Sequence, residues 1–452
     1  MNERATESAS SLQRLFEVEI VDFNVEGAGV GRWDGRVVFV PGGVIGDRLE
    51  VRVVAERRRW LEALPVKLIE PSAHRRPALC AQQGRCGGCP LMIVDPATAL
   101  AWKVRHLSRQ LEKLAEVVLP IEPVLPSPLA VEYRSRVRLA LTRRGGRWRA
   151  GYRPRGRGRG VVTVDRCHLL APGGWEVVER LLAALDGASL ASGQAPSHLE
   201  VRASLAAGRW LALWHGGRAA GGELRRLSRR VLEMGAPLAG VALVGRSGRR
   251  PVWVEGRREV IERIGEIAFP LGFQGFAQVN PAAAGALYRL AGRALRDPEG
   301  KAPDSLLDLY CGAGLLALHG AGPSTRVVGV EADPAGLRPA AAAARVRGLD
   351  DARFVAGDAE AITTRLADAG ERFEALAINP PRAGMGASIP RLARTLGVER
   401  VVMVSCHPAT AARDVARLEA AGFRAVAVGA VDMFPQTPHL EVVIRLESEG
   451  GR

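Results

Sequence analysis

A cysteine and a carboxylate near the C-terminal end of the sequence are the residues best suited to covalent chemistry. Residues 401–404 read Val-Val-Met-Val, a short apolar run typical of a buried strand, and Ser405, Cys406 and His407 follow directly. Pro408 has no N–H with which to continue strand pairing, so the strand has to end here. The sequence thereby holds the Cys406 thiol at a strand end, where α/β folds place their reactive groups.

The carboxylates that could serve this thiol lie in residues 432–441, which begin with Asp432 and end with Glu441. A thiol nucleophile with a base beside it is the minimum set of groups for covalent catalysis. A cysteine in isolation, however, is more often a small buried hydrophobic residue. The motifs elsewhere in the chain therefore decide between the two interpretations.

Cysteine spacing predicts a metal or cluster site in the first half of the chain. Cys80, Cys86 and Cys89 have the spacing C-x5-C-x2-C, and the glycines before Cys89 let the loop wrap closely. A closed site needs a fourth thiolate, for which Cys167, after a strand-like pattern, is the best candidate. Four thiolates suit either zinc or an iron–sulfur cluster. Pro90 after Cys89 favours iron–sulfur because bacterial cluster sequences often end in Cys-Pro, although spacing alone does not decide.

Strand ends in the second half of the chain carry glycines and polar residues in a specific order. One strand pattern runs into a turn that contains Gly312 and Gly314, and the next strand ends in Glu331. The interval of about twenty residues between Gly312 and Glu331 is the spacing at which an acidic side chain meets ribose hydroxyls in a doubly wound sheet. Two further strands end near Asp358 and Asn379. A lone Gly-x-Gly is weak evidence, but this order looks like the sheet of a class I S-adenosylmethionine (SAM) methyltransferase.

The elements that position these groups begin with a predicted β-barrel. Residues 16–70 alternate apolar and polar side chains and are interrupted by glycines at short intervals, as in a small antiparallel barrel. No helix pattern follows the glycines at 27, 29 and 31, so these do not form a dinucleotide-binding loop. Residues 57–60, Arg-Arg-Arg-Trp, put charge beside an aromatic ring, which suits RNA but fits a solvated loop equally well.

A helix and a strongly basic stretch follow the cysteines. Residues 96–116 carry apolar residues at helical spacing, and the Pro-rich residues 119–128 are interpreted as a linker. Residues 133–160 contain eleven arginines and no acidic residue, with aromatic residues interleaved and a Gly-Arg repeat at 155–160. A basic β-surface of this kind is typical of RNA binding, and the alternative is a charged hairpin tip.

Length and charge limit the class of protein. The 452 residues predict two to four domains, and a composition with 47% hydrophobic and 25% charged residues is ordinary for a globular protein. The formal net charge of +15 favours a polyanionic partner, with nucleic acid first. No signal-peptide pattern and no run of about 18 apolar residues is present, so we expect a cytoplasmic protein with reduced thiols and no membrane partner.

Over nearly its whole length the sequence resembles the bacterial uracil-C5 RNA methyltransferases that carry an iron–sulfur cluster, and most of all the type that acts on large-subunit ribosomal RNA. The resemblance rests on five motifs: Tyr-Arg-Ser-Arg at 133–136, Phe-Ala-Gln-Val-Asn at 276–280, Asp-Leu-Tyr-Cys-Gly-Ala-Gly at 308–314, Ser-Cys-His-Pro-Ala-Thr at 405–410, and the segment 432–441.

The resemblance implies cofactors and roles. It implies that the barrel is a TRAM domain, that the four cysteines above hold a 4Fe–4S cluster, and that the protein methylates C5 of a uridine in RNA with SAM as donor. Cys406 would add to C6 of the base, and Glu441 would remove the C5 proton. The residues that the resemblance or the strand ends assign to SAM are Gln278, Tyr310, Gly312, Gly314, Glu331, Asp358 and Asn379.

Three positions depart from the family's pattern. Asn379 stands where the family usually has Asp, Leu315 replaces a polar SAM contact, and His407 replaces the usual Asn beside the nucleophile. Losing one or two hydrogen bonds to SAM costs about 1–3 kcal/mol, or roughly ten- to a hundredfold in affinity. The pair Cys406 and Glu441 is retained, which favours an active enzyme.

Two other functions stay open. Asn379 and Leu315 are compatible with a non-catalytic RNA-binding iron–sulfur paralogue. Asn-Pro-Pro is also the type of motif that amino-group methyltransferases carry, so the acceptor could be a nitrogen, or C5 of cytosine. The TRAM-like barrel favours ribosomal RNA over transfer RNA, and the sequence does not identify the nucleotide. We expect a monomer.

The expected architecture is an OB-like β-barrel, a middle α+β domain with the iron–sulfur site, and a C-terminal doubly wound, Rossmann-like α/β domain. The expected boundaries are 12–72 for the barrel, 73–95 and 125–268 for the central iron–sulfur and RNA-binding domain, 96–124 for a helix and linker that pack on the catalytic domain, and 269–452 for the methyltransferase domain.

Overall fold

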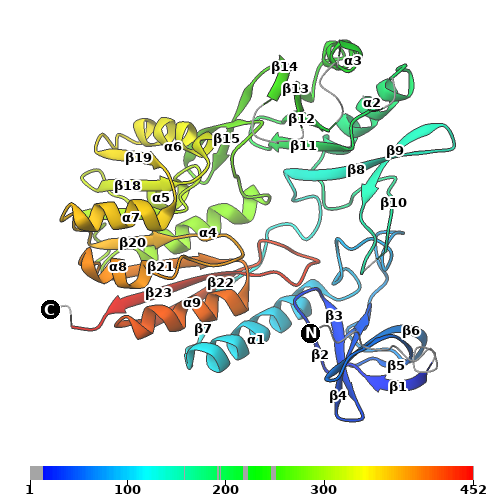
Figure 1. The fold of residues 1–452 in the computed structure, drawn as a ribbon, viewed down its shortest axis with the longest axis horizontal. Helices are drawn as coiled ribbons and strands as arrows, with labels where there is room; N and C mark the ends of the chain where they lie inside the picture. The colour runs from blue at the N-terminus through cyan, green and yellow to red at the C-terminus, as the bar shows by residue number, and fades with distance from the viewer. Residues whose placement is uncertain are drawn as a thin grey trace, which may run out of the picture. The chain divides into compact units, whose positions relative to one another are not determined.

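The computed structural model describes residues 14–156, 158–190, 193, 195–216, 222–245 and 251–450. The chain forms two compact units (Figure 1). The first unit consists of Met1–Lys103, Tyr152–Val164 and Phe434–His439, and the second consists of Val104–Gly151, Asp165–Met433 and Leu440–Arg452.

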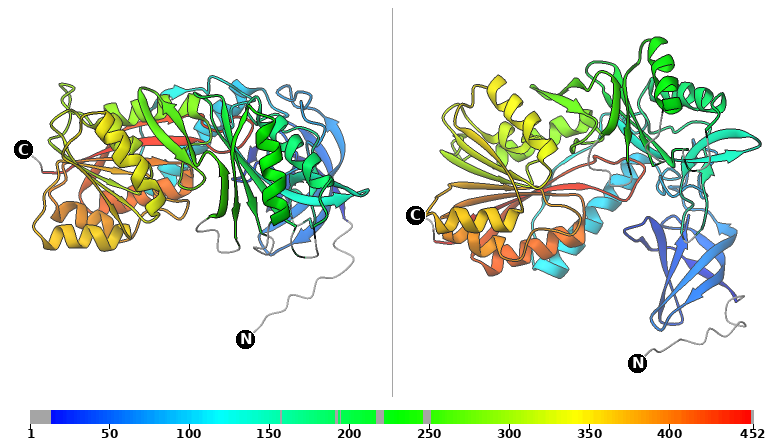
Figure 2. Two further views of the ribbon diagram at one scale, coloured as in Figure 1. Left: turned by 90° about the horizontal axis from the view of Figure 1, so that it is seen from above. Right: turned by 45° about the horizontal axis from the view of Figure 1, so that its top comes forward.

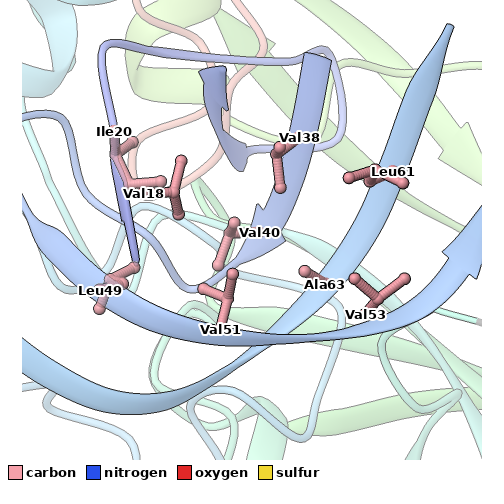
Figure 3. Packing of buried hydrophobic residues seen from close by; sticks show 9 residues of the cluster. All are labelled: Val18, Ile20, Val38, Val40, Leu49, Val51, Val53, Leu61 and Ala63. Atoms are coloured by element: carbon pink, nitrogen blue, oxygen red, sulfur yellow. The ribbon is translucent and has the colours of Figure 1, made fainter. Parts of the chain in front are cut away.

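The first unit contains the predicted barrel. Its six strands pair in the order β1-β5-β6-β4-β3-β2, and every second residue points inward because successive side chains of a strand alternate in direction. Figure 3 shows the resulting core, which includes Val18, Val38, Val51 and Leu61. The strands are β1 (Leu15–Glu19), β2 (Asp22–Phe23), β3 (Ala28–Trp33), β4 (Arg36–Pro41), β5 (Arg48–Glu56) and β6 (Trp60–Glu70).

The segment that follows the barrel carries three of the cysteines and binds a distant part of the chain. Within the first unit, the backbone N–H of Leu91 donates to the Gln436 carbonyl at 3.0 Å, and Nη2 of Arg76 donates to Oε1 of Gln436 at 3.1 Å. The buried Lys103 amine donates to the Phe434 carbonyl at 3.1 Å. Lys103 lies on α1 (Pro96–Ala115), which confirms the predicted helix.

The middle of the chain, in the second unit, forms an antiparallel-dominated sheet with helices on one face. Six of its strands pair in the order β9-β8-β11-β12-β13-β14. Helices α2 and α3 pack against β11–β14, as Figure 1 shows. The elements are β8 (Arg136–Arg144), β9 (Arg147–Tyr152), α2 (Gly174–Asp186), β11 (His198–Ser204), β12 (Arg209–His215), α3 (Gly222–Glu233), β13 (Leu238–Val244) and β14 (Pro251–Gly256), followed by the hairpin of β15 (Glu259–Ile264) and β16 (Ile267–Gly272).

The C-terminal part of the second unit is an eight-stranded sheet with helices on both faces (Figure 2). The order is β19-β18-β17-β20-β21-β23-β22-β7, in which β17 to β21 are parallel and β23 is antiparallel to both neighbours. The strands are β17 (Ser305–Leu309), β18 (Arg326–Glu331), β19 (Ala352–Ala356), β20 (Ala375–Ile378), β21 (Arg400–Ser405), β22 (Phe423–Val431) and β23 (Glu441–Ser448), and the helices are α4 (Pro281–Ala294), α5 (Leu315–Gly320), α6 (Pro334–Val346), α7 (Ala359–Asp368), α8 (Ile389–Thr395) and α9 (Pro408–Ala420). The five strands predicted for the SAM sheet are thus confirmed.

One strand lies where the sequence was interpreted as a linker. β7 (Ile121–Leu125) pairs in parallel with β22 at the edge of the eight-stranded sheet. An edge strand needs N–H groups on only one side, so it can contain Pro123 without losing a ladder bond in the interior. In the part of the chain that the structure describes, no helix is long and apolar enough to cross a membrane.

Candidate active site

Strand pairing brings the predicted nucleophile and base together. β21 and β23 run antiparallel, and Ser405 at the end of β21 pairs with Val442 near the start of β23. Cys406 follows Ser405 directly and Glu441 precedes Val442, and the charge of Glu441 raises the pKa of the Cys406 thiol. The two groups therefore meet at the carboxyl end of β21, as a reactive pair in an α/β sheet should.

Burial determines the protonation state of Glu441. Only 4% of the residue is exposed, and desolvation raises the pKa of its carboxyl to about 7, against the opposing charge of Arg382. Its Oε2 atom makes no hydrogen bond to any residue that the structure describes. A carboxylate with a pKa near 7 can both accept and release a proton at neutral pH, which is the property that a general base needs.

The Cys406 thiol is subject to three influences. Burial raises its pKa, and the negative charge of Glu441 raises the pKa further. The charge of Arg382 and its hydrogen bond to the thiol lower the pKa, but only in part, so the net shift is upward. Without a ligand, the sulfur is therefore mainly a protonated thiol at neutral pH.

His407, which departs from the family's usual Asn, caps helix α9. Its Nδ1 accepts the backbone N–H of Thr410 at 3.3 Å, and the Thr410 hydroxyl lies 2.9 Å from the same nitrogen. Burial and the charges of Arg382 and Arg413 lower the pKa of His407, so the ring is neutral and Nδ1 can accept. The histidine thus does what an asparagine does at a helix N-cap, and the helix start is preserved.

A pocket opens beside the glycine turn that follows β17. Tyr310 is held at a positive φ of 60° as the chain leaves the strand. Of the residues predicted to bind SAM, Tyr310, Gly312 and Asn379 line this pocket. Its other lining residues are Phe276, Ala277, Tyr288, Asp308, Cys311, Ala313, Leu315 and Leu316.

Two acidic residues predicted to bind SAM lie outside the lining of this pocket. Glu331 accepts the backbone N–H of Gly312 at 3.0 Å and that of Asp333 at 2.8 Å, so its carboxylate fixes the glycine turn. Asp358 caps α7 by accepting the N–H of Ala361 at 3.0 Å. Each carboxylate keeps further lone pairs that could accept from a ligand hydroxyl.

The backbone conformation at the start of α5 explains why a glycine stands at position 314. The next residue, Leu315, affects the lining of the pocket. Gly314 is the N-cap residue with φ 73°, and a Cβ there would lie 3.0 Å from the Phe354 ring. A side chain at this position would therefore be strained and crowded. Leu315 is buried and lines the pocket, which presents an apolar wall at this point.

Two buried residues that the sequence analysis did not single out lie at the base of the pocket. Burial raises the pKa of Asp308 to about 7, although a hydrogen bond from Ala317 opposes this, and its Oδ1 finds no partner among the described residues. Burial likewise raises the pKa of Tyr288, whose hydroxyl hydrogen-bonds to the side chain of Gln278. Asp308 belongs to the glycine-turn motif and could have been found there. Tyr288 lies in an alanine-rich helix and has no signal in the sequence.

A larger cleft of about 1540 Å³ opens on the face of the middle sheet opposite α2 and α3. Its walls come from β8, β11 and β12, from residues 273–276 and from the start of α6. Phe276 lines both the cleft and the glycine-turn pocket, and 57% of this residue is exposed. The cleft and the pocket are therefore neighbours, with an aromatic side chain at their junction.

Charged side chains cover the sheet face of this cleft. Burial alone would raise the pKa of Glu200, but hydrogen bonds from His215 and Arg136 and the nearby positive charges outweigh it and lower the pKa to about 2. Arg202 is buried, and its Nη2 donates to the Gly275 carbonyl at 3.2 Å, next to Phe276. Burial lowers the pKa of Arg202 to about 10, so the residue stays charged at neutral pH.

The basic stretch at residues 133–160 serves more than one role. Arg136 and Arg138 line the cleft, as expected for an RNA-binding surface. Residues 143–147 form the exposed tip of the β8–β9 hairpin, which is the alternative interpretation. In the first unit, Nη2 of the half-buried Arg155 donates to the Gly27 carbonyl at 3.1 Å, so this arginine is a structural anchor. Arg157, within the predicted Gly-Arg repeat, lies outside the described residues.

The structure does not support the predicted metal site. Among the residues described, no group of three or more His, Cys, Asp or Glu side chains is arranged to hold a metal ion. Cys80, Cys86 and Cys89 belong to the first unit, and Cys167 belongs to the second. The four-cysteine site therefore remains a prediction from the sequence.

Comparison with known proteins decides the family. Residues 239–449 match the family model described as tRNA (Uracil-5-)-methyltransferase, and residues 13–66 match the TRAM domain. A 23S rRNA (uracil(1939)-C(5))-methyltransferase of Pseudomonas fluorescens is 32% identical over 94% of this chain and 92% of the relative. This chain belongs to the RNA (uracil-5-)methyltransferase family. The family prediction is thus confirmed, together with the TRAM domain and SAM-dependent methyl transfer as the class of activity.

Other members of the RNA (uracil-5-)methyltransferase family agree with this result. An uncharacterised RNA methyltransferase of Geobacter sulfurreducens is 30% identical over 96% of this chain and 90% of the relative. The crystal structure of a tRNA (uracil-54, C5)-methyltransferase of Pyrococcus abyssi, in complex with S-adenosyl-L-homocysteine, superposes with a TM-score of 0.73, covering 95% of this chain and 99% of that one. At 22% identity this likeness shows the fold, and it confirms the Rossmann-like domain.

The raised pKa of Glu441 predicts that folding stability decreases with pH. In the unfolded chain this carboxyl ionises near its ordinary pKa of about 4.3, whereas in the folded protein it holds its proton up to about pH 7. The folded state therefore binds more protons between these values, and stability falls as pH rises through this window. A shift of this size corresponds to a penalty on the order of 3 kcal/mol above pH 7.

We expect Glu441→Gln to remove this penalty, so the variant should be more stable than the wild type at pH 8 and nearly equal at pH 4.5. Urea unfolding at a series of pH values measures this difference. The raised pKa of Asp308 gives both proteins a further decrease of stability as pH rises through the same range. Glu447→Gln, in the same strand but 46% exposed, is the matched control. If the stability of the wild type and of Glu441→Gln depended equally on pH, the raised pKa of Glu441 would be contradicted.

Proposed function

We propose that this protein transfers the methyl group of SAM to C5 of a uridine in RNA, through a covalent bond between Cys406 and C6 and with Glu441 as the base. The observation that carries the proposal is the pairing of β21 with β23, because Cys406 follows the paired residue Ser405 and the buried Glu441 precedes its partner Val442. Covalent methylation of a pyrimidine needs these two groups side by side.

The chemistry assigns a step to each of the two residues. Uracil C5 is too weak a nucleophile to take a methyl group unaided. After losing its proton to solvent, Cys406 adds as a thiolate to C6, which breaks the C5–C6 double bond and turns the ring into an enolate. C5 then forms a bond to the methyl carbon while the bond from that carbon to sulfur breaks. Glu441 removes the C5 proton, and the electron pair re-forms the double bond and expels Cys406 as a thiolate.

SAM, when bound, supplies the electrophilic methyl group, and the residues that line the glycine-turn pocket would contact part of it. The unpartnered Oδ1 of Asp308 is a buried polar atom in the pocket wall, available to a ligand. The apolar Leu315 removes one polar contact, so we expect weaker binding than in relatives with a polar residue there. The residues proposed to bind SAM are Gln278, Tyr310, Gly312, Gly314, Glu331, Asp358 and Asn379.

The environment of Glu441 favours a catalytic protein over a non-catalytic paralogue. A buried carboxyl with an unpartnered oxygen destabilises the fold. Strongly perturbed carboxyls of this kind cluster at functional sites. A methyltransferase for an exocyclic amine would need no thiol opposite the carboxyl, so the pair also favours a C5 acceptor.

The target base has to leave its stack to be attacked on its face. The cleft beside Phe276 offers a basic sheet surface and an exposed aromatic ring, which are the features that bind single-stranded RNA. We propose ribosomal RNA as the substrate because the chain carries a TRAM domain and resembles a 23S rRNA methyltransferase over most of its length.

Removing the nucleophile should abolish methylation and spare SAM binding. For Cys406→Ala we expect methyl transfer from radiolabelled SAM to RNA to fall by about three orders of magnitude or more. Calorimetry should show SAM affinity within about twofold of the wild type, because the thiol takes no part in holding the donor. Methylation that survives this substitution would instead indicate an acceptor, such as an amino group, that needs no covalent attack.

A substrate with fluorine at C5 should trap the covalent step. Glu441 cannot remove fluorine as a cation, so RNA that contains 5-fluorouridine should stay attached to Cys406 after methyl transfer. A protein–RNA band on a denaturing gel, present with the wild type and lost with Cys406→Ala, is the expected result. Active protein that forms no such band would refute the covalent mechanism.

The choice of RNA can be tested in cells. Mass spectrometry of nucleosides from cells with and without the gene should show 5-methyluridine missing from ribosomal RNA, with transfer RNA unchanged. The opposite pattern would reassign the substrate to transfer RNA while leaving the chemistry intact.

We also propose that Cys80, Cys86 and Cys89 bind iron, with Cys167 as the fourth ligand predicted from the sequence. The donor set supports this proposal, since three thiols lie within ten residues beside two glycines. A cluster there would be structural, and no step of the methylation requires it. Anaerobically purified protein should contain iron and sulfide, and Cys86→Ser should lower the iron content while Cys311→Ser should not. Protein that contains zinc, or no metal, would contradict the assignment.

A further inference from the structure

We propose that the cleft of the middle sheet continues along the hairpin of β8 and β9 as a track for the RNA backbone, which binds phosphate groups outside the target nucleotide. This arginine track consists of Arg138, Arg144, Arg147 and Arg149, all of them exposed. The inference rests on the proposed function, because it extends the RNA-binding surface of the same site. The sequence left this stretch open between an RNA-binding surface and a charged hairpin tip.

Strand pairing places the four arginines on one face of the sheet. In an antiparallel pair, residues directly opposite each other share a face, and so do residues two apart along one strand. Arg138 pairs with Glu200 of β11, and both residues line the cleft. Further along, Arg144 of β8 pairs with Arg147 of β9, and Arg149 lies two residues beyond Arg147. The face that forms the floor of the cleft therefore continues to the tip of the hairpin.

The hairpin extends beyond the rest of the middle sheet (Figure 1). The pairing of β8 with β11 ends at Ala140, whereas its pairing with β9 continues to Arg144. At about 3.4 Å for each residue of an antiparallel strand, the distance from Arg138 to Arg144 is roughly 20 Å. The track is thus too long for a single phosphate group and suits a chain of several nucleotides.

The arginines of the track lack the carboxylate partners that arginines on the other face of this sheet have. On the helix side, Arg180 of α2 pairs with Glu176. In α3, Arg226 pairs with Glu223, and Glu255 of β14 binds two further arginines of this helix. Within the part of the chain that the structure describes, no side chain of the track forms a hydrogen bond or an ion pair. Positive charge is therefore balanced on the helix side and left unbalanced along the track.

The hairpin holds like charges together, which opposes its stability. Arg144 and Arg147 are directly opposed, and like charges at opposed positions destabilise a strand pair. Asp186 at the end of α2 does not relieve the repulsion, because it accepts the backbone N–H of Trp148 at 2.6 Å. Phosphate groups would relieve it, since they accept charge-assisted hydrogen bonds from guanidinium groups.

The acidic residue beside the track is already balanced by a cation. Among the described residues on this face of β8, β9 and β11, Glu200 is the one carboxylate. Its Oε1 lies 2.7 Å from Nε of Arg136, and its Oε2 lies 3.3 Å from Nε2 of His215. The excess positive charge of this face therefore comes from the track, and Glu200 does not repel an RNA chain that enters from the hairpin.

The composition of the track favours the backbone over the bases as its ligand. Trp148 pairs with Arg143, so the aromatic ring of the hairpin belongs to the opposite face and cannot stack on a base bound along the track. Contacts between arginine and phosphate fix the position of a nucleic acid and carry no sequence information. We therefore expect binding by the track to be independent of RNA sequence and strongly dependent on salt.

The test measures RNA affinity against salt concentration with the full-length protein and without SAM. The probe is a fluorescein-labelled oligouridine of about 20 nucleotides, and fluorescence anisotropy gives the dissociation constant between about 50 and 200 mM salt. When Arg144, Arg147 and Arg149 are all changed to Gln, the slope of log affinity against log salt should become shallower by about 2, because each phosphate contact on a single strand contributes about 0.7. The loss of affinity should be largest at low salt and should shrink by more than about tenfold across this range.

A pair of single variants provides the matched control. Arg147→Gln should reduce the slope by about 0.7, whereas Arg143→Gln should leave it unchanged. Both remove one positive charge from the tip, but Arg143 lies on the opposite face, and its Nε donates to the Gly146 carbonyl at 3.1 Å. Changing the three residues to Lys instead should retain most of the slope, since the charge remains.

An unchanged slope for the triple Gln variant would overturn the inference, and so would an equal fall for Arg143→Gln. If the triple Gln variant fails to fold, as judged by circular dichroism, Arg147→Gln and Arg143→Gln decide the question by the same measurement. An exposed tip that binds an acidic protein in place of RNA would give the first of these contrary results.

The outcome separates this inference from the proposed function. If Cys406→Ala is inactive but the triple Gln variant binds RNA as the wild type does, the track is wrong and the covalent mechanism stands. If Cys406→Ala remains active while the triple Gln variant loses affinity and slope, the covalent mechanism fails and the track stands.

Discussion

The antiparallel pairing of β23 with β21 is the constraint on which the active site depends. A parallel sheet alone would place the thiol at a strand end with only loops around it. Because β23 runs in the opposite direction, its first residue, Glu441, lies beside the last residues of β21. A shift of the register by one residue would turn the carboxyl to the other face of the sheet and separate the two groups.

The site gains its reactivity from burial, and burial opposes the charged form of both groups. Glu441 holds its proton up to neutral pH, and Cys406 resists becoming a thiolate. The positive charge of Arg382 offsets part of this effect at both groups. Substrate binding excludes water further, so these electrostatic effects matter more in the complex than in the free protein.

The sequence specified most of the fold because its signals were local. Alternating residues predicted the barrel, and the glycine turn and strand ends predicted the doubly wound sheet. Motifs led us to expect Cys406 close to Glu441, but local patterns do not determine this closeness, since it depends on a pairing between distant strands. The roles of Arg155 as an anchor and of residues 121–125 as an edge strand had no local signal either, because both depend on tertiary contacts. Tyr288 was missed for the same reason.

The first unit is assembled from three separate stretches of the chain, and this affects how it is made. Its barrel strands leave the ribosome and can pair long before Gln436, the partner of Arg76 and Leu91, has been synthesised. The first unit is therefore completed only after most of the second unit has been translated. A nascent chain halted before that point would present the cysteine segment without its binding partner, so maturation of the first unit is linked to synthesis of the second.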